Sequence, residues 1–206
     1  MILGVYNVAC LLTLSGATAA MTAIYTASTG KTELALVWLI LAGLADLFDG
    51  VIARKLALNS FEKEYGVQLD TVVDVVAFVV TPFIIAFHAG MGSAWILCGL
   101  AVFVLAGIIR LAHFNTLSVR SANSSTHHHG LPVTYTALFL PLLFIARDFL
   151  TPVLFSALLA VSFPLVGLLF VIDIPIRKPY GIFYVLLPLV AVVLIAYWLW
   201  RFLGTS

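Results

Sequence analysis

Charge is the property that this sequence has least of. Only 9% of its 206 residues are charged, whereas 63% are hydrophobic, and the mean hydropathy is +1.17. Soluble domains carry about 25% charged residues, so the composition excludes a soluble domain and indicates an integral membrane protein. The formal net charge of +1 provides no basic surface for nucleic acid, and we expect no nucleic-acid partner.

Cysteine is also scarce. Cys10 and Cys98 lie inside different apolar runs without a C-x-x-C spacing, so we interpret both as buried packing residues. The first apolar run, from Ile2, lacks a basic n-region and a polar cleavage zone, and we expect it to remain as a helix. No linker or repeat divides the chain, which predicts a single domain over residues 1–206.

Long apolar runs are what the sequence has instead. They extend over roughly 18–25 residues, the length of a bilayer-crossing helix, whereas barrel strands alternate over about 10 residues. We therefore predict an all-α integral membrane protein, a polytopic helical bundle with about six to eight transmembrane helices. The count stays open because the fifth and sixth runs are short and contain Pro141 and Pro164. The candidate spans are about 3–28, 32–57, 65–88, 93–115, 131–148, 152–172 and 180–202.

Basic residues are divided unevenly between the predicted loops. With a cytoplasmic N-terminus, seven would face the cytoplasm and three the opposite side. The seven are Arg54, Lys55, Lys63, Arg110, Arg120, Arg177 and Lys178, and the three are Lys31, Arg147 and Arg201. The positive-inside rule thus predicts a cell-membrane protein in which the loop after the second span faces the cytoplasm and the C-terminus lies outside.

Four aspartates interrupt the end of the second span and the beginning of the third. They are Asp46, Asp49, Asp70 and Asp74. At about 100° per residue, the first two share a helix face with Gly50 and Ala53, and the last two follow Gly66 at intervals of four. Because a short loop joins the two spans, we expect the two faces to lie opposite each other across a polar cleft.

Such a group of carboxylates needs a partner. They would repel one another strongly unless a cation neutralised them, and each charge costs a few kcal/mol at membrane depth. Oxygen ligands without Cys or His favour Mg²⁺, Mn²⁺ or Ca²⁺ over zinc. Small Gly50 and Ala53 leave space for a ligand, and Arg54 can pair with a phosphate. Together these features point to phosphoryl chemistry on a lipid.

The pattern Asp46-x-x-Asp49-Gly50-x-x-Ala53-Arg54, then Gly66-x-x-x-Asp70-x-x-x-Asp74, resembles the signature of the CDP-alcohol phosphatidyltransferases. Every fixed position of that motif is present. Eleven residues separate Arg54 from Gly66, where the common form has eight, which predicts a longer helix end or loop.

This resemblance implies a helical bundle, usually a homodimer, with two Mg²⁺ or Mn²⁺ ions in an active site that faces the cytoplasm. It implies that Asp46, Asp49 and Asp70 hold the metals and the CDP diphosphate. Asp74 would complete the second metal site and act as the catalytic base. The CDP-binding set would also include Gly50, Ala53, Arg54 and Gly66, whose small members leave room for the nucleotide.

Two later stretches resemble the serine-transferring branch of the family. They are "GIIRLAHFNT" at 107–116 and "HHHGLPVTYTALFLP" from His127, together with "LDTVVDVVAFVVTP" at 69–82. The branch has an arginine where this chain has His113. From this resemblance we expect Arg110, His113 and Asn115 to bind the acceptor. A guanidinium is a good bidentate reader of a carboxylate, although Arg110 could equally be a headgroup anchor or a phosphate ligand.

The expected reaction is transfer of the phosphatidyl group from CDP-diacylglycerol to L-serine, giving phosphatidylserine and CMP. Within the same class, the acceptor could instead be glycerol 3-phosphate, inositol phosphate, choline or another alcohol. The alternative from another functional class is a cation-coupled transporter, because such carriers also hold carboxylates between helices, usually near the bilayer midplane. The role of His127–His129 stays open, because contiguous histidines lack the spacing of helical metal ligands.

Overall fold

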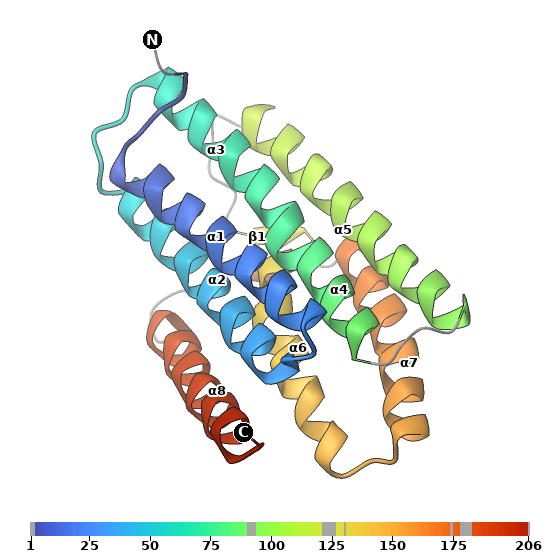
Figure 1. Cartoon of the computed structure of the whole chain (residues 1–206). Helices are drawn as coiled ribbons and strands as arrows, with labels where there is room; N and C mark the ends of the chain where they lie inside the picture. The colour runs from blue at the N-terminus through green and yellow to red at the C-terminus, as the bar shows by residue number, and fades with distance from the viewer. Residues whose placement is uncertain are drawn as a thin grey trace.

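The computed structural model of the protein describes residues 3–89, 94–120, 127–129, 131–173, 175–177 and 183–205. Helices make up nearly all of this described part (Figure 1), which confirms the predicted all-α class. The helices are α1 (Val8–Ser28), α2 (Thr32–Ala53), α3 (Ser60–Asp74), π-helical η1 (Val75–Val80), α4 (Thr81–His88), α5 (Ala94–Arg120), 3₁₀ turn η2 (Val133–Tyr135), α6 (Thr136–Ile145), 3₁₀ turn η3 (Ala146–Asp148), α7 (Pro152–Val171) and α8 (Phe183–Thr205).

Six helical segments of the described part are long and apolar enough to cross a bilayer. They are Val8–Ser28, Thr32–Ala53, Ser60–His88, Ile96–Leu117, Pro152–Val171 and Val185–Gly204. Each corresponds to one of the seven predicted spans. The remaining predicted span, 131–148, consists of the ten-residue α6 between two three-residue 3₁₀ turns. The count is therefore at the lower end of the predicted range.

The eleven residues between Arg54 and Gly66 form a loop followed by the first turns of α3. Residues 54–59 connect α2 to α3. Asn59 Oδ1 accepts a hydrogen bond from the Glu62 amide, and Glu62 Oε2 accepts one from the Asn59 amide, both at 2.9 Å. This reciprocal capping box satisfies two amides that would otherwise lack partners. It sets the beginning of α3 at Ser60, ahead of Gly66.

A π-helical segment, η1, follows Asp74 directly and joins α3 to α4. Pro82 explains its position, because proline lacks an N–H and its ring collides with the carbonyl four residues earlier. The Thr81 amide bonds instead to the Val76 carbonyl, five residues back, and Thr81 Oγ1 donates to the same oxygen at 2.8 Å. The helical path thus continues from Ser60 to His88 as one span.

The helices pack as a bundle of roughly aligned rods. In Figure 1, α1 lies between α2 and the continuous α3–α4, with α5 and α7 on the other side of α3–α4. Phe103 of α5 contacts Phe163 and Phe170 of α7, with ring centroids 5.0 and 5.4 Å apart. The chain reversals bring the end of α2, the beginning of α3 and the end of α5 to the same end of the bundle (Figure 1).

Helices α2 and α6 approach each other closely at Gly43. A Cβ atom built on Gly43 would lie 2.6 Å from the Cβ atom of Ala137, which is shorter than side-chain atoms tolerate. The absence of a side chain at this position therefore lets the beginning of α6 reach the half of α2 that carries the aspartates.

We expect Gly43→Ala to lower the free energy of unfolding by about 1–3 kcal/mol, because the new methyl group must push α6 away from α2. Gly66→Ala is the matched control. Both glycines lie inside helices, but nothing lies within 4 Å of a Cβ at Gly66, so this change should only add helix propensity of about 1 kcal/mol. Unfolding of both variants in the same detergent makes the comparison. Equal stability of Gly43→Ala and the parent would contradict the close approach.

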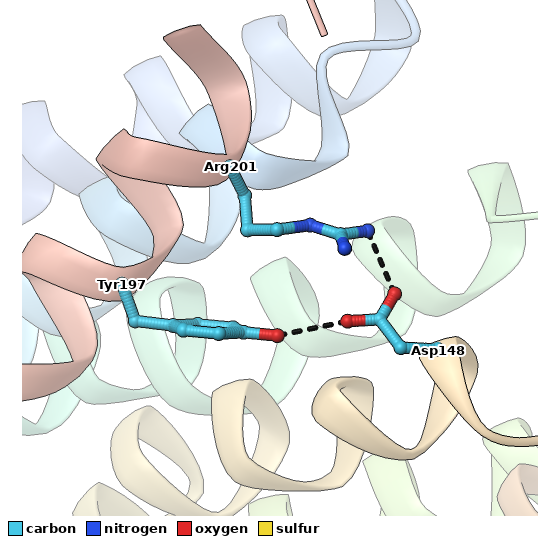
Figure 2. Close-up of polar contacts among 3 residues, drawn as sticks. All are labelled: Asp148, Tyr197 and Arg201. Atoms are coloured by element: carbon cyan, nitrogen blue, oxygen red, sulfur yellow. Dashed lines mark hydrogen bonds and ion pairs between the residues drawn. The ribbon is translucent and has the colours of Figure 1, made fainter. Parts of the chain in front are cut away.

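Two residues of helix α8 bond to the aspartate at the end of η3 (Figure 2). Tyr197 Oη donates a hydrogen bond to Asp148 Oδ2 at 2.8 Å, and Arg201 Nη2 donates to Asp148 Oδ1 at 2.7 Å. Each oxygen of the carboxylate thus has its own donor from α8. This cluster lies toward the C-terminal end of α8, and the rest of the helix runs beside α2 (Figure 1).

One small sheet completes the described part. Strand β1 (His127–His129) pairs antiparallel with β2 (Pro175–Arg177), with His127 opposite Arg177. The side chains of His127–His129, Arg120 and Arg177 are not among those described, and Lys178 lies outside the described residues. The predicted role of the histidines and the predicted orientation therefore rest on the sequence.

Candidate active site

The aspartates predicted to face each other lie together. One side-chain oxygen from each of Asp46, Asp49 and Asp70 lies within 4.8 Å of the other two. The first two come from the C-terminal part of α2, and the third comes from α3. The predicted juxtaposition of the two helix faces is thereby confirmed.

Asp74 lies one turn further along α3 than Asp70. Its side chain is only 8% exposed, and its Oδ1 is buried without a hydrogen-bond partner in the described part of the chain. A buried carboxylate oxygen without a donor is unfavourable, since its lost hydration is not replaced. Such an atom is suited to a proton or a cation that arrives with a ligand.

All four aspartates line one cavity of about 340 Å³. Its walls are contributed by α2, α3, α5, α8 and the residues that begin α6. The carboxylates make one side polar, whereas leucines make much of the rest apolar. These leucines are Leu44, Leu47, Leu111, Leu138 and Leu187. A cavity with both characters is suited to a ligand that has a charged part and an apolar part.

Two arginines line the same cavity. Arg54 follows Gly50 by one turn, and its Nη1 lies 3.6 Å from the place of a Cβ on Gly50. Arg110 is only 6% exposed, its Nε donates to the Leu131 carbonyl at 3.3 Å, and its guanidinium carbon lies 5.3 Å from the centre of the Phe114 ring. Backbone and ring therefore hold Arg110 at the cavity wall, where a cation–π contact stabilises the charge.

Four other predicted site residues are not part of the cavity lining among the described residues. They are Ala53, Gly66, His113 and Asn115. The His113 side chain is exposed, and Asn115 Nδ2 donates to Gln68 Oε1 on α3 at 3.1 Å. Their predicted contacts with CDP or with the acceptor remain predictions.

Several cavity residues had no role in the sequence-based prediction. Thr134, Tyr135 and Phe114 line the cavity, as do Leu187 and Ala191 of α8, and the Thr134 hydroxyl lies beside the Asp46 carboxylate. Thr13 of α1 donates a hydrogen bond to Asp49 at 2.5 Å. Phe114 follows Arg110 by one helical turn, so periodicity could have found it. Nothing in the sequence indicated Thr13 or the part played by α8.

The residues of this cavity fit divalent cations. Four carboxyl groups and two guanidinium groups give the described lining a formal charge of −2. The three clustered oxygens and the unpartnered Asp74 Oδ1 are hard oxygen donors, which Mg²⁺ and Mn²⁺ prefer. Asp46, Asp49, Asp70 and Asp74 are therefore the residues that would hold such ions.

Comparison with known sequences agrees with this chemistry. The sequence model of the CDP-alcohol phosphatidyltransferases matches residues 6–200. A protein named CDP-diacylglycerol–serine O-phosphatidyltransferase from Helicobacter pylori is 36% identical over 111 residues, which cover 51% of this chain and 44% of that protein. The protein of the same name from Saccharomyces cerevisiae is 36% identical over 115 residues, covering 52% of this chain and 41% of the relative.

An archaeal relative carries a different name. Archaetidylserine synthase of Methanothermobacter thermautotrophicus is 33% identical over 111 residues, covering 53% of this chain and 45% of that protein. The chain thus matches somewhat less than half the length of each of these three curated relatives. The names of all three relatives include serine, whereas the archaeal name refers to a different lipid from the other two.

Proposed function

Because the chain belongs to the CDP-alcohol phosphatidyltransferase family, we propose that it transfers the phosphatidyl group of CDP-diacylglycerol to L-serine and releases CMP. The observation that carries this proposal is the cavity in which Asp46, Asp49 and Asp70 meet within 4.8 Å beside an apolar wall. The names of the relatives favour serine as the acceptor.

Two Mg²⁺ or Mn²⁺ ions at the aspartates would neutralise the diphosphate and stabilise the charge that develops on it during displacement. In the proposed reaction, the serine oxygen forms a bond to the phosphorus that carries the diacylglycerol. The bond from that phosphorus to the bridging oxygen breaks, and CMP leaves with the electron pair. Atoms and charge balance once the hydroxyl proton has been removed.

Asp74 is the residue proposed to remove that proton. It lines the cavity beside the Asp46 carboxyl group, and one of its oxygens has no donor among the described residues, so a lone pair is left to accept the proton. Arg54, one turn after Gly50, is placed to pair with a CDP phosphate. Gly50 has no side chain to extend from α2 into the cavity, which leaves space for the nucleotide.

Arg110 is the proposed partner of the serine carboxylate. It is the buried arginine of the described cavity lining, and the Leu131 carbonyl and the Phe114 ring hold its guanidinium group in place. A fixed guanidinium binds a carboxylate through two parallel hydrogen bonds. Acceptors with a phosphate would call for more positive charge than the two arginines of the described lining supply, which favours an amino acid.

We expect Arg110→Ala to raise the KM for serine about tenfold or more, because a charge-assisted hydrogen bond contributes roughly 1.5–3 kcal/mol. The KM for CDP-diacylglycerol should change much less. Arg147→Ala is a suitable control, since Arg147 is exposed in η3 and away from the cavity lining. Steady-state kinetics with each substrate varied in turn makes the measurement. An equal loss for both substrates would remove the carboxylate role from Arg110.

The proposal as a whole is tested by CMP release from CDP-diacylglycerol. Purified protein is supplied with Mg²⁺ or Mn²⁺ and one acceptor at a time: serine, glycerol 3-phosphate, inositol phosphate or choline. Release that depends on serine supports the proposal. Release with a different acceptor would keep the reaction class and overturn the acceptor. Binding of neither CMP nor donor would favour a cation-coupled transporter.

Three further features belong to the same proposal. The active site faces the cytoplasm, which the excess of basic residues in the loops at that end supports. The protein acts as a homodimer, as is usual in the family. Residues 1–206 form one domain, which the match over residues 6–200 supports.

A further inference from the structure

Thr13 is a polar residue in the apolar helix α1, and its hydroxyl faces the aspartate cluster. Its side chain is 7% exposed, and that of Asp49 is 6% exposed. Thr13 Oγ1 lies 2.5 Å from Asp49 Oδ2 and 3.1 Å from the Ala9 carbonyl. A hydroxyl has one proton to donate, and the shorter contact to a charged acceptor receives it. Thr13 is therefore committed to Asp49.

The contact depends on the close approach of α1 and α2 beside it. Gly16, one turn after Thr13, has no side chain, and a Cβ there would lie 3.3 Å from the Ala45 Cβ and 3.6 Å from the Ala42 carbonyl. A larger residue at this point would hold the two helices apart. The short distance between the helices is what brings a threonine hydroxyl within reach of the carboxylate.

Thr13 approaches Asp49 from outside the main cavity. It does not belong to the lining of that cavity in the described residues, whereas Asp49 does. Thr13 and Asp49 also border a small hollow together with Asp46 and Asp70. Thr13 therefore lies behind the main cavity, and its hydrogen bond restricts rotation of a carboxylate that lines the cavity.

We propose that Thr13 is a positioning residue for Asp49, and that its hydrogen bond holds the Asp49 carboxylate in the orientation that binds the divalent cation. The inference rests on the proposed function for its relevance to turnover. Its physical basis is general, because a carboxylate that binds a metal is held by hydrogen bonds from residues behind it, and loss of such a bond typically weakens metal affinity about 10- to 100-fold.

The test compares three substitutions on α1. Thr13→Val keeps the shape and removes the hydroxyl, and Thr13→Ser keeps the hydroxyl. Thr26→Val is the matched control, because Thr26 is also 7% exposed and its hydroxyl bonds, among the described residues, to the Thr22 and Ala23 carbonyls of its own helix. Binding of Mn²⁺ to each purified protein is followed by electron paramagnetic resonance, without substrates and without turnover.

We expect Thr13→Val to weaken Mn²⁺ binding about 10- to 100-fold, and Thr13→Ser and Thr26→Val to retain the parent affinity. Parent-like Mn²⁺ affinity in folded Thr13→Val would overturn the inference, and so would equal losses in Thr13→Val and Thr26→Val. If Thr13→Val does not fold, Thr13→Ala replaces it, with the same two outcomes. Because the readout is metal binding, the result is separate from CMP release, whose failure would count against the proposed function alone.

Discussion

Replacing Asp74 with asparagine is expected to lower the rate of phosphatidyl transfer by about 10²- to 10⁴-fold, the usual contribution of a general base. The amide has nearly the same shape as the carboxylate but cannot take the proton of the attacking hydroxyl. Because Asp74 lies beside other carboxylates, the substitution removes repulsion, and we expect the folded protein to be at least as stable as the parent. Single-turnover CMP release at saturating serine measures the effect.

The matched control is Asp148→Asn. Asp148 is the last residue of η3 and accepts hydrogen bonds from Tyr197 and Arg201, and it does not line the cavity (Figure 2). The same chemical change there should leave turnover close to the parent rate. Near-parent turnover in Asp74→Asn would show that another group accepts the proton. A loss in both variants would show that removal of any aspartate from the bundle disturbs the enzyme.

The second large effect is expected at Gly50. A Cβ at this position would lie 3.6 Å from Arg54 Nη1, an ordinary contact, so the helix itself tolerates a side chain. The side chain would instead extend into the cavity that Gly50 lines. We expect Gly50→Leu to lower kcat/KM for CDP-diacylglycerol by about 10²-fold or more, since displacement of a reacting group by about 1 Å has an effect of that size.

The graded series Gly50→Ala, Gly50→Val and Gly50→Leu supplies its own control. If the cavity admits the nucleotide at this point, the loss should increase with side-chain size while Mn²⁺ binding stays at the parent level. A flat series, with Leu as active as Gly, would place the nucleotide elsewhere. Loss of Mn²⁺ binding in step with activity would mean that the substitution disturbs Asp49 instead of blocking the donor.

Local periodicity predicted the aspartate cluster correctly. Asp46 and Asp49 lie less than one turn apart on α2, and a short connection returns the chain to Asp70. These two facts are enough to bring the three carboxylates together, and their oxygens do lie within 4.8 Å. What the connection could not predict is the packing behind the cluster. Thr13 belongs to a different helix, and its contact with Asp49 depends on how closely α1 approaches α2.

The acceptor-binding prediction took its three residues from one contiguous run, and it remains a prediction. Arg110, His113 and Asn115 occupy one helix, but at about 100° per residue Asn115 lies about 140° from Arg110, and His113, although only about 60° from Arg110, is exposed. The fourth residue on from Arg110, Phe114, returns to the same face and lines the cavity with it. Asn115 instead reaches Gln68. The linear motif does not show which of its residues share a helix face, whereas the structure of α5 does.

The spans show a similar limit. Six long apolar runs became membrane-length helices, but residues 131–148 formed a short α6. Apolar composition alone does not distinguish a complete span from a short buried helix. The close approach at Gly43 and Ala137 is a property of two segments far apart in sequence. The contribution of α8 to the cavity, through Leu187 and Ala191, is equally remote from any local pattern.

The position of the capped beginning of α3 bears on which concentration of each proposed substrate determines the rate at which it reaches the site. Asp70 follows Ser60 by ten residues, or about 15 Å along the helix axis, and the intervening first turns carry Glu62, Lys63 and Glu64. These charges favour water, so we expect the aspartates to lie close to the membrane boundary. In the proposed reaction, the donor lipid would then arrive by lateral diffusion, in proportion to its mole fraction in a two-dimensional phase. An acceptor in solution arrives from a three-dimensional one, in proportion to its molarity.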